Sequence, residues 1–211
     1  NPDGTQGYTW NPVTGCLHGC SYCFAAKMAK RFKQSFEPTF HEERLREPLK
    51  LKKPSTIFVG SACDLFGDWV SKDWIDAVFD VVNQLQQHSW IFLTKNPARY
   101  KDCESKKSGN IFFGATITNQ DAKIDTQLID FISFEPLLGF DKKSFDKMLS
   151  GSVQQIIIGG LNESGSIVCI PQNQVIKLVE LAQDKGIKVF CKNSIIKLWP
   201  DSEWPRELIW G

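Results

Sequence analysis

The sequence predicts an α/β fold built on a parallel sheet, a (βα) barrel that is closed or partial. Three observations lead to this prediction. Seven short apolar runs have the length and composition of strands, segments with helical character lie between most of them, and polar residues stand where the apolar runs stop. The seven expected strands are 7–11, 56–59, 89–95, 110–119, 129–139, 153–160 and 187–193.

The segments between these strands carry recognisable helix signals. Residues 24–32 have helical composition, and the apolar residues of 72–85 recur with the period of an amphipathic helix. Residues 171–186 open with Pro171 and close with Gly186, as a capped helix does. The connection between the fourth and fifth strands, NQDAKIDTQLIDFISF (119–134), is short for a helix plus a loop. Either this chain has a trimmed connection or residues are absent from the sequence given, and both alternatives leave the barrel rim open at this point.

Length and composition limit the class of protein. The chain has 211 residues with 25 basic and 24 acidic side chains, which gives a formal net charge of +1 and no strong overall attraction to nucleic acids or membranes. We expect one domain over 1–211 with no separate accessory domain. There is no secretory signal, and no apolar stretch approaches the roughly 20 residues of a membrane helix. These features predict a cytoplasmic protein with no membrane partner.

The cysteines give the most specific signal. Seven cysteines, an odd number, argue against a disulfide framework in a chain of this length. Three of them, Cys16, Cys20 and Cys23, lie within eight positions, and a disulfide between two would leave one thiol over. The remaining four are far apart in the sequence: Cys63, Cys103, Cys169 and Cys191.

Two metal centres explain three close thiols. A [4Fe–4S] cluster held by three thiolates accounts for the count and leaves one iron open to a further ligand. Gly15 and Gly19 would let such a loop curl so that backbone amides approach the cluster. A structural zinc ion takes four protein ligands, so a zinc site would need His18, inside the loop, or His41, outside it. Ligand chemistry alone favours the cluster and leaves zinc open.

The pattern Cys16-x-x-x-Cys20-x-aromatic-Cys23, with Tyr22 at the aromatic position, resembles the signature of the radical S-adenosylmethionine (radical SAM) superfamily. Nearly the whole chain resembles a phage-type radical SAM-like family distantly related to spore photoproduct lyase. The matching segments are TGCLHGCSYCFAAKMAKRF, FHEERLREPLKLKKPSTIFVGSACDLFGDWV, FLTKNPARY, ATITNQ, ISFEPLLG, IIIGG and FCKN. The resemblance implies an α/β fold, a partial (βα)6-7 barrel of the radical SAM type with a parallel sheet.

The resemblance also implies cofactors and chemistry. Cys16, Cys20 and Cys23 would hold a [4Fe-4S] cluster, and the open iron would bind the methionine part of S-adenosylmethionine. One electron from the cluster would then cleave S-adenosylmethionine reductively to methionine and a 5′-deoxyadenosyl radical, which abstracts hydrogen from the substrate. The electron would come from a reductase or a flavodoxin-type electron donor.

The segments that match the superfamily also imply which residues would bind S-adenosylmethionine. At the end of the second strand the superfamily binds the ammonium group of S-adenosylmethionine, often through a Gly-Gly-Glu motif. This chain has GSACD instead, so we expect Ser61, Asp64 and the carbonyls of 60–62 to take that part. Lys95 is similar to a lysine that pairs with the methionine carboxylate in the spore photoproduct lyase group. The open alternative for Lys95 is an exposed strand-end lysine.

The remaining contacts to S-adenosylmethionine are expected at other strand ends and beside the cysteines. The candidates are Thr116, Thr118 and Asn119 for the ribose hydroxyls, Tyr22 or Phe24 for the adenine, and Glu135 for S-adenosylmethionine or the substrate. A core role for Tyr22 or Phe24 and a turn role for Glu135 before Pro136 remain open.

Two further cysteines each have two possible roles. Cys63, next to the expected S-adenosylmethionine site, could return a hydrogen atom to a product radical, as a cysteine does in spore photoproduct lyase. The alternative, favoured by cysteine's general behaviour, is a small buried apolar side chain. Cys191 beside Lys192 has the same alternatives.

The function predicted is that of a radical SAM enzyme acting on a nucleic acid, a nucleotide or a partner protein. For a nucleic acid, the basic segments 27–33 and 50–53 and Trp69 or Trp74 would serve phosphate contact and stacking. The alternative function is a non-catalytic, zinc-stabilised binding module that grips its ligand with polar residues at the strand ends. Those residues are Ser61, Asp64, Thr94, Lys95, Thr118, Asn119, Glu135, Asn162, Glu163, Lys192 and Asn193.

Overall fold

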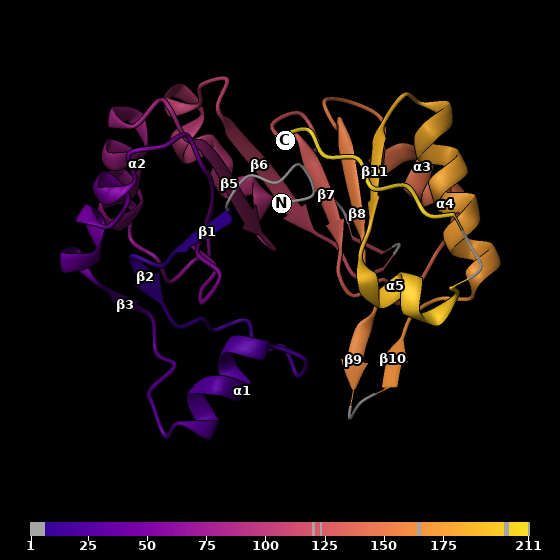
Figure 1. Cartoon of the computed structure of the whole chain (residues 1–211), viewed down its shortest axis with the longest axis horizontal. Coiled ribbons are helices and arrows are strands. Elements are labelled where there is room, and N and C mark those ends of the chain that lie inside the picture. Colours follow the sequence, from indigo (N-terminus) through magenta and orange to yellow (C-terminus); the bar gives the residue numbers. More distant parts are fainter. Residues whose placement is uncertain (1–6, 120, 123, 164–165, 201–202, 211) are drawn as a thin grey trace. The chain divides into compact units, whose positions relative to one another are not determined.

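The fold was analysed in a computed structural model of the chain, which describes residues 7–119, 121–122, 124–163, 166–200 and 203–210. The chain divides into two compact units (Figure 1). Unit 1 comprises Asn1–Phe113 with Trp210–Gly211, and unit 2 comprises Gly114–Ile209. The expectation of a single domain over 1–211 stays a prediction. In the part of the chain that is described, no helix has the length and apolar character needed to cross a bilayer.

Seven strands form the main sheet in the order β1-β4-β5-β6-β7-β8-β11. The pairings of β1 with β4, β4 with β5, β6 with β7, β7 with β8 and β8 with β11 are all parallel. The fold is therefore α/β with a parallel sheet of the partial-barrel class, as the sequence predicted. The strands are β1 (Gly7–Trp10), β4 (Thr56–Val59), β5 (Ser89–Thr94), β6 (Ile111–Thr116), β7 (Phe131–Phe134), β8 (Gln155–Ile158) and β11 (Lys188–Cys191).

Unit 1 has an aromatic core beneath helix α2 (Lys72–Gln84). Ser71 caps this helix, because its hydroxyl accepts a hydrogen bond from the backbone N–H of Trp74. The rings of Phe79 and Phe92 stack at 5.1 Å between centroids, which fixes α2 against β5. The other elements of the unit are α1 (Phe24–Arg31), β2 (Val13–Thr14), β3 (Thr39–Phe40) and the 3₁₀ segments Glu42–Arg46, Pro48–Lys50 and Pro97–Lys106.

Unit 2 has a largely aliphatic core, with α3 (Lys142–Met148) and α4 (Gln172–Asp184) beside its strands (Figure 1). Buried Val175 and Leu178 of α4 and buried Ile156 and Ile158 of β8 belong to one apolar cluster. Burial of such side chains stabilises the unit by about 1.5–3 kcal/mol each. The unit also contains α5 (Asn193–Leu198) and a hairpin of β9 (Leu161–Glu163) and β10 (Ser166–Val168).

All seven expected strands are present, and most are shorter than their apolar runs. The helices expected over 24–32, 72–85 and 171–186 are present within two residues of those bounds. Among the described residues between β6 and β7 there is no helix. The two small antiparallel pairs, β2 with β3 and β9 with β10, and helices α3 and α5 were not expected, because their runs are too short to show a period.

Candidate functional site

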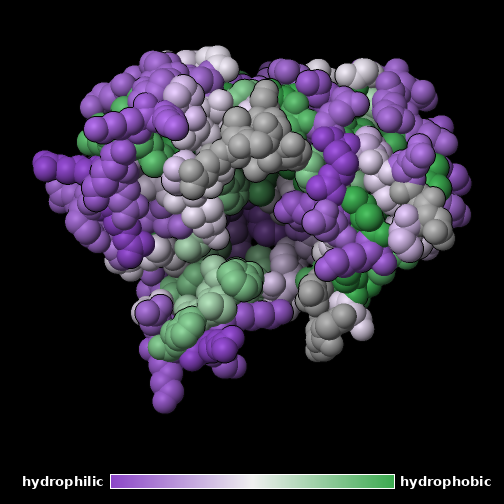
Figure 2. All heavy atoms as spheres, in the orientation of Figure 1, coloured by the Kyte–Doolittle hydropathy of each residue, from purple (hydrophilic) through white to green (hydrophobic). Residues whose placement is uncertain are grey.

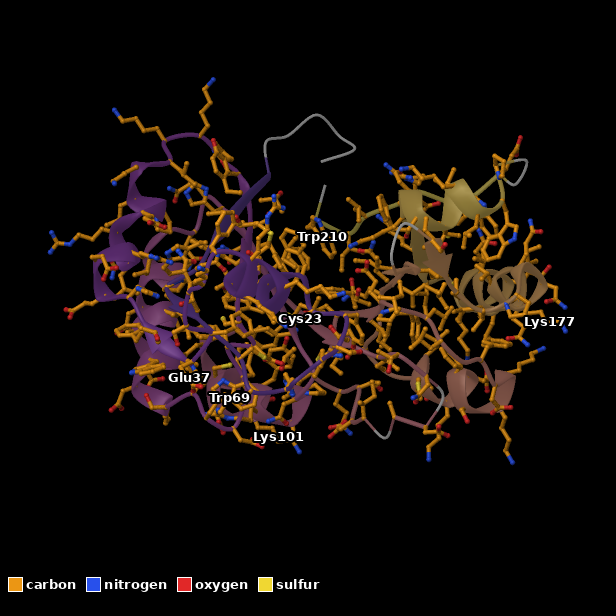
Figure 3. All side chains as sticks on the ribbon, turned by 90° about the horizontal axis from the view of Figure 1, so that it is seen from below. Cys23, Glu37, Trp69, Lys101, Lys177 and Trp210 are labelled. Carbon is orange, nitrogen blue, oxygen red and sulfur yellow. The ribbon has the colours of Figure 1, made fainter. Side chains whose placement is uncertain are left out.

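The three close cysteines lie on one loop that leads into α1. Cys23, labelled in Figure 3, is the helix cap. Its Sγ accepts a hydrogen bond from the backbone N–H of Ala26 at 3.4 Å, and its own N–H donates to the carbonyl of Cys20 at 3.0 Å. Cys16, Cys20 and Cys23 are free thiols and partly exposed. The loop therefore offers three sulfur atoms that could bind a metal, because none is in a disulfide and none is deeply buried.

Two glycines shape this cysteine loop. Gly15 and Gly19 have φ values of +84° and +64°, the left-handed region that glycine adopts without strain. A Cβ atom on Gly15 would lie 2.2 Å from the backbone oxygen of Glu37, whereas a Cβ atom on Gly19 would meet nothing within 4 Å. The expectation that glycines let the loop curl is confirmed for the backbone, and at Gly15 the close packing leaves no room for a side chain.

The segment after β4 lies directly against the cysteine loop. The N–H of Gly15 donates to the carbonyl of Ala62 at 3.0 Å, and Gly15 forms a parallel bridge with Cys63. Asn11, just after β1, accepts hydrogen bonds at Oδ1 from the Ala62 N–H at 2.9 Å and from the Ser61 hydroxyl at 3.2 Å. The ends of β1 and β4 thus bring Ser61 to the loop.

Asp64 ties the cysteine loop to the ends of β4 and β5. Its side chain is only 8% exposed, and each carboxylate oxygen accepts two hydrogen bonds. Oδ1 accepts from the Thr94 hydroxyl at 2.7 Å and the Phe66 N–H at 3.1 Å. Oδ2 accepts from the Lys95 N–H at 2.9 Å and from Nε2 of His18 at 2.7 Å. Four donors satisfy the lone pairs of this buried carboxylate, so it acts as a fixed anchor.

Lys95 and Tyr22, 73 positions apart in the sequence, meet at the cysteine loop. The ammonium group of Lys95 donates to the Tyr22 hydroxyl at 2.6 Å and lies 5.2 Å from the centre of the Tyr22 ring. Lys95 follows β5 directly, and Asp64 holds its backbone N–H. A cation is thereby held on Tyr22, at the aromatic position of the cysteine motif.

The thiols influence one another electrostatically. Burial raises the pKa of the Cys16 thiol, and the negative charges of Asp64, Cys20 and Cys23 raise it further, while the backbone N–H of His18 lowers it. Three thiolate donors from one loop are the donor set that a cluster with one open iron requires. Among the described residues, no group of three or more His, Cys, Asp or Glu side chains converges as metal ligands. The donor chemistry therefore fits a cluster, and the side-chain positions are not those of a formed metal site.

The two histidines considered as a fourth zinc ligand have other partners. Nε2 of His18 contacts Asp64, and the His18 ring packs edge-on against Trp69 with centroids 4.9 Å apart. Nε2 of His41 lies 2.8 Å from the Thr14 hydroxyl, and its Nδ1 lies 3.3 Å from the Glu43 carboxylate.

Cys63 lies between Ser61 and Asp64, beside the cysteine loop. A Cβ atom on Gly60 would come within 3.1 Å of its sulfur, so Gly60 leaves the space that the thiol occupies. Burial raises the pKa of the Cys63 thiol far above its ordinary range, and Asp64 adds to the effect. Cys191, by contrast, is fully buried in the apolar cluster of unit 2, which agrees with the packing role.

In unit 2, Glu135 and Lys192 form a separate polar cluster. Nζ of Lys192 lies 2.6 Å from Oε1 of Glu135, and the buried Ser133 hydroxyl donates to Oε2 at 2.7 Å. Glu135 directly follows β7, and Lys192 directly follows β11. The carboxyl ends of these two strands therefore bring their polar residues together.

The other expected contacts of unit 2 have local structural partners. Asn119 accepts the Asp121 N–H at Oδ1, as in an Asx turn, and the carbonyl of Thr118 accepts the Leu138 N–H. Thr116 is the last residue of β6. Asn162 and Glu163 belong to β9. Their side chains are not described, so the roles expected for them stay predictions.

Two contacts of the site in unit 1 were not predicted from the sequence. Asn11 fixes Ser61 and Ala62, and His18 joins the cysteine loop to Asp64. Asn11 had a usable signal, because it is a polar residue immediately after an apolar strand. His18 had none beyond its place between two cysteines.

Comparisons with known proteins agree with this fold. The family model described as "Protein of unknown function (DUF5131)" matches residues 5–194. No curated protein matches the chain. Among solved structures, spore photoproduct lyase in complex with dinucleoside spore photoproduct is similar, with a TM-score of 0.61, 8% identity, and coverage of 87% of this chain and 76% of the lyase chain.

Two variants of the same lyase are also similar. A cysteine-to-serine variant has a TM-score of 0.61 and 10% identity, covering 85% of this chain and 75% of the lyase chain. A tyrosine-to-phenylalanine variant has a TM-score of 0.52 and 12% identity, covering 92% and 61%. At these identities the likeness shows the fold that the chain shares with spore photoproduct lyase.

Proposed function

The chain belongs to the DUF5131 family, and from its spore photoproduct lyase-like fold and its cysteine loop we propose that it is a radical SAM enzyme. Cys16, Cys20 and Cys23 would hold a [4Fe–4S] cluster. When bound, the cluster supplies the electron that cleaves S-adenosylmethionine to methionine and a 5′-deoxyadenosyl radical, which takes hydrogen from the substrate.

One observation carries this proposal: Lys95 is fixed at the cysteine loop by two hydrogen bonds. Its ammonium group donates to the Tyr22 hydroxyl, and its backbone N–H donates to the Asp64 carboxylate. A cation fixed on Tyr22 of the cysteine loop is the group that a carboxylate bound there would need. Because Lys95 is only partly buried, it can exchange the neutral Tyr22 hydroxyl for a carboxylate partner. Lys95 therefore binds and orients the methionine carboxylate, and Tyr22 lies beside it.

The geometry changes the role proposed for Asp64. Its lone pairs are already used by four protein donors, so the ammonium group of S-adenosylmethionine is better served by Ser61 and the carbonyls of 60–62. Asp64 becomes a positioning residue, which holds Lys95 and the cysteine loop in register. The contacts of Thr118, Asn119 and Glu135 to the ribose and to S-adenosylmethionine or the substrate stay predictions from the sequence.

For Cys63 we retain the role of hydrogen-atom donor. Its S–H group would give one hydrogen atom to a carbon radical on the product, and the sulfur radical left behind would take one electron from the electron donor and one proton. The position of Cys63 after β4, between Ser61 and Asp64, supports this role. Cys63→Ala is expected to block product formation while cleavage of S-adenosylmethionine continues.

A nucleotide-containing substrate is the class that the comparisons favour. Spore photoproduct lyase is seen in complex with a dinucleoside photoproduct, and this chain shares its fold. A nucleic acid or a nucleotide is therefore proposed ahead of a partner protein. The zinc-module alternative would need a fourth ligand other than His18 or His41, since both rings contact other side chains.

The test starts from anaerobically prepared protein. We expect a brown protein with about four iron and four sulfide per chain. With dithionite and S-adenosylmethionine it should release 5′-deoxyadenosine. Cys20→Ala should lose both the cluster and this product, whereas Cys169→Ala, which removes a partly exposed thiol outside the loop, should keep both. A colourless protein with stoichiometric zinc would contradict the proposal.

A further inference from the structure

An exposed surface around the cysteine loop combines apolar and cationic side chains. Leu17, Phe24 and Phe32 are 53%, 76% and 59% exposed, whereas large apolar side chains elsewhere in the described chain are rarely so open. Figure 2 shows apolar side chains gathered over α1, with strongly hydrophilic ones next to them. We call these three residues, together with Lys27, Lys30, Arg31 and Lys33, the α1 surface.

The charge on the α1 surface is uncompensated. Residues 16–35 contain four basic and no acidic residues, while the rest of the chain carries 21 basic and 24 acidic residues. Among the described residues, no ion pair involves a cation of this surface. The surface is therefore a local positive field on a chain that is otherwise slightly negative, and such a field selects an acidic partner.

The α1 surface includes the cysteine loop itself. Leu17 lies between Cys16 and Cys20, and Phe24 follows Cys23, whose Sγ caps the helix. A partner that covers this surface therefore lies against the loop that would hold the proposed cluster. Exposed aromatic side chains ringed by cations are also what a docking protein can bury.

We propose that the α1 surface is the docking site of an acidic one-electron donor protein of the flavodoxin class. This inference rests on the proposed function. The flavodoxin hydroquinone gives one electron to the oxidised cluster, so the flavin becomes a semiquinone and the cluster is reduced by one electron. The cations steer the acidic donor to the loop, and the exposed apolar side chains hold it there.

The experiment uses the anaerobic holoprotein and reduced flavodoxin, with cluster reduction followed in a stopped-flow instrument. Lys30→Gln/Arg31→Gln removes two charges and keeps residues that favour helix. We expect its bimolecular rate constant at low salt to fall about tenfold, and the difference from wild type to shrink at high salt. The matched control, Lys52→Gln/Lys53→Gln, removes two exposed charges ahead of the amino end of β4 and should stay within about twofold.

A neutral small reductant, photoreduced deazaflavin, separates this inference from the proposed function. It should reduce the cluster and drive 5′-deoxyadenosine formation equally in wild type and both variants. If wild type has no cluster or gives no product with deazaflavin, the proposed function is wrong. If those succeed and Lys30→Gln/Arg31→Gln accepts electrons from flavodoxin at the wild-type rate, the docking proposal is wrong.

A labelled single-stranded oligonucleotide tests the competing occupant. Binding that is lost in Lys30→Gln/Arg31→Gln, with the flavodoxin rate unchanged, would assign the α1 surface to nucleic acid and overturn the proposal.

Discussion

The two units hold polar side chains at their strand ends in different ways. In unit 1 the Asp64 side chain is 8% exposed and accepts hydrogen bonds from four protein donors. In unit 2 the side chains of Glu135 and Lys192 are 27% and 46% exposed and rest mainly on one ion pair. Buried, fully satisfied networks fix their members, whereas water competes for an exposed pair.

This difference corresponds to two tasks of the proposed enzyme. A cofactor that generates a reactive radical must be held in one place, and the anchored loop of unit 1 can do so. A substrate must enter and leave, and the open pair of unit 2 can rearrange to accommodate it. Substitutions in the polar network of unit 1 should therefore have large effects on stability and cofactor binding, whereas those in the ion pair of unit 2 should have small effects.

The largest effect is expected from Gly15→Ala. Its Cβ would overlap the backbone oxygen of Glu37, and φ is +84°, so both packing and backbone conformation oppose a side chain. We expect a loss of roughly 2–5 kcal/mol in the free energy of unfolding, read from urea denaturation of the apoprotein. Reconstitution with iron and sulfide should fail as well.

Gly19→Ala is the matched control within the same loop. It also has a positive φ, of +64°, but no atom lies within 4 Å of its Cβ. The cost should be only about 1–2 kcal/mol, from backbone strain alone. Equal losses in the two variants would show that the loop is not held against Glu37 as described.

Asp64→Asn is expected to have the next largest effect. Asparagine keeps the shape of the side chain but replaces one acceptor oxygen with an N–H₂ group, which would face the backbone N–H of Lys95 in one orientation and that of Phe66 in the other. A buried donor left without an acceptor costs about 1–3 kcal/mol. We expect a lower urea midpoint and a lower iron content after reconstitution.

Asp68→Asn makes the same change at an exposed carboxylate nearby, which accepts one hydrogen bond from Asn96. Its effect on stability should be within about 0.5 kcal/mol. If Asp64→Asn were equally mild, Asp64 would not be the anchor of the loop.

The sequence predicted the strands and the cysteine loop because their signals are local. Apolar runs of strand length and three close cysteines are visible without knowing what they contact. The role of Asp64 was not visible, since its partners His18, Thr94 and Lys95 lie in segments far from it in the sequence. Asp64 and Ser61 look alike as strand-end polar residues, and only burial distinguishes an anchored carboxylate from an accessible hydroxyl. The placement of Lys95 on Tyr22 likewise depends on strand order, which periodicity cannot supply.

Lys95→Met tests whether the Lys95 ammonium group binds S-adenosylmethionine, and it should have little effect on stability. The thioether keeps the apolar stem but removes the charge that the proposal assigns to the methionine carboxylate. We expect affinity of the holoprotein for S-adenosylmethionine, measured by equilibrium dialysis, to fall about 10- to 100-fold.

Tyr22→Phe is the corresponding control, because it removes the hydroxyl that Lys95 contacts and keeps both the ammonium group and the ring. Its affinity should change by less than about tenfold. If Lys95→Met binds S-adenosylmethionine as wild type does, Lys95 is a surface lysine and the observation that carries the proposed function fails.

The smallest effect is expected for the pair in unit 2. Glu135→Gln, Lys192→Met and the double variant form a thermodynamic cycle that isolates the interaction of the two side chains. Because both are partly exposed, their coupling energy should be about 0.2–1 kcal/mol and should decrease in about 0.5 M salt. A coupling above about 2 kcal/mol that salt does not weaken would mean that the strand ends of unit 2 are as rigidly organised as those around Asp64. The contrast between a fixed cofactor edge and an adaptable substrate edge would then have to be abandoned.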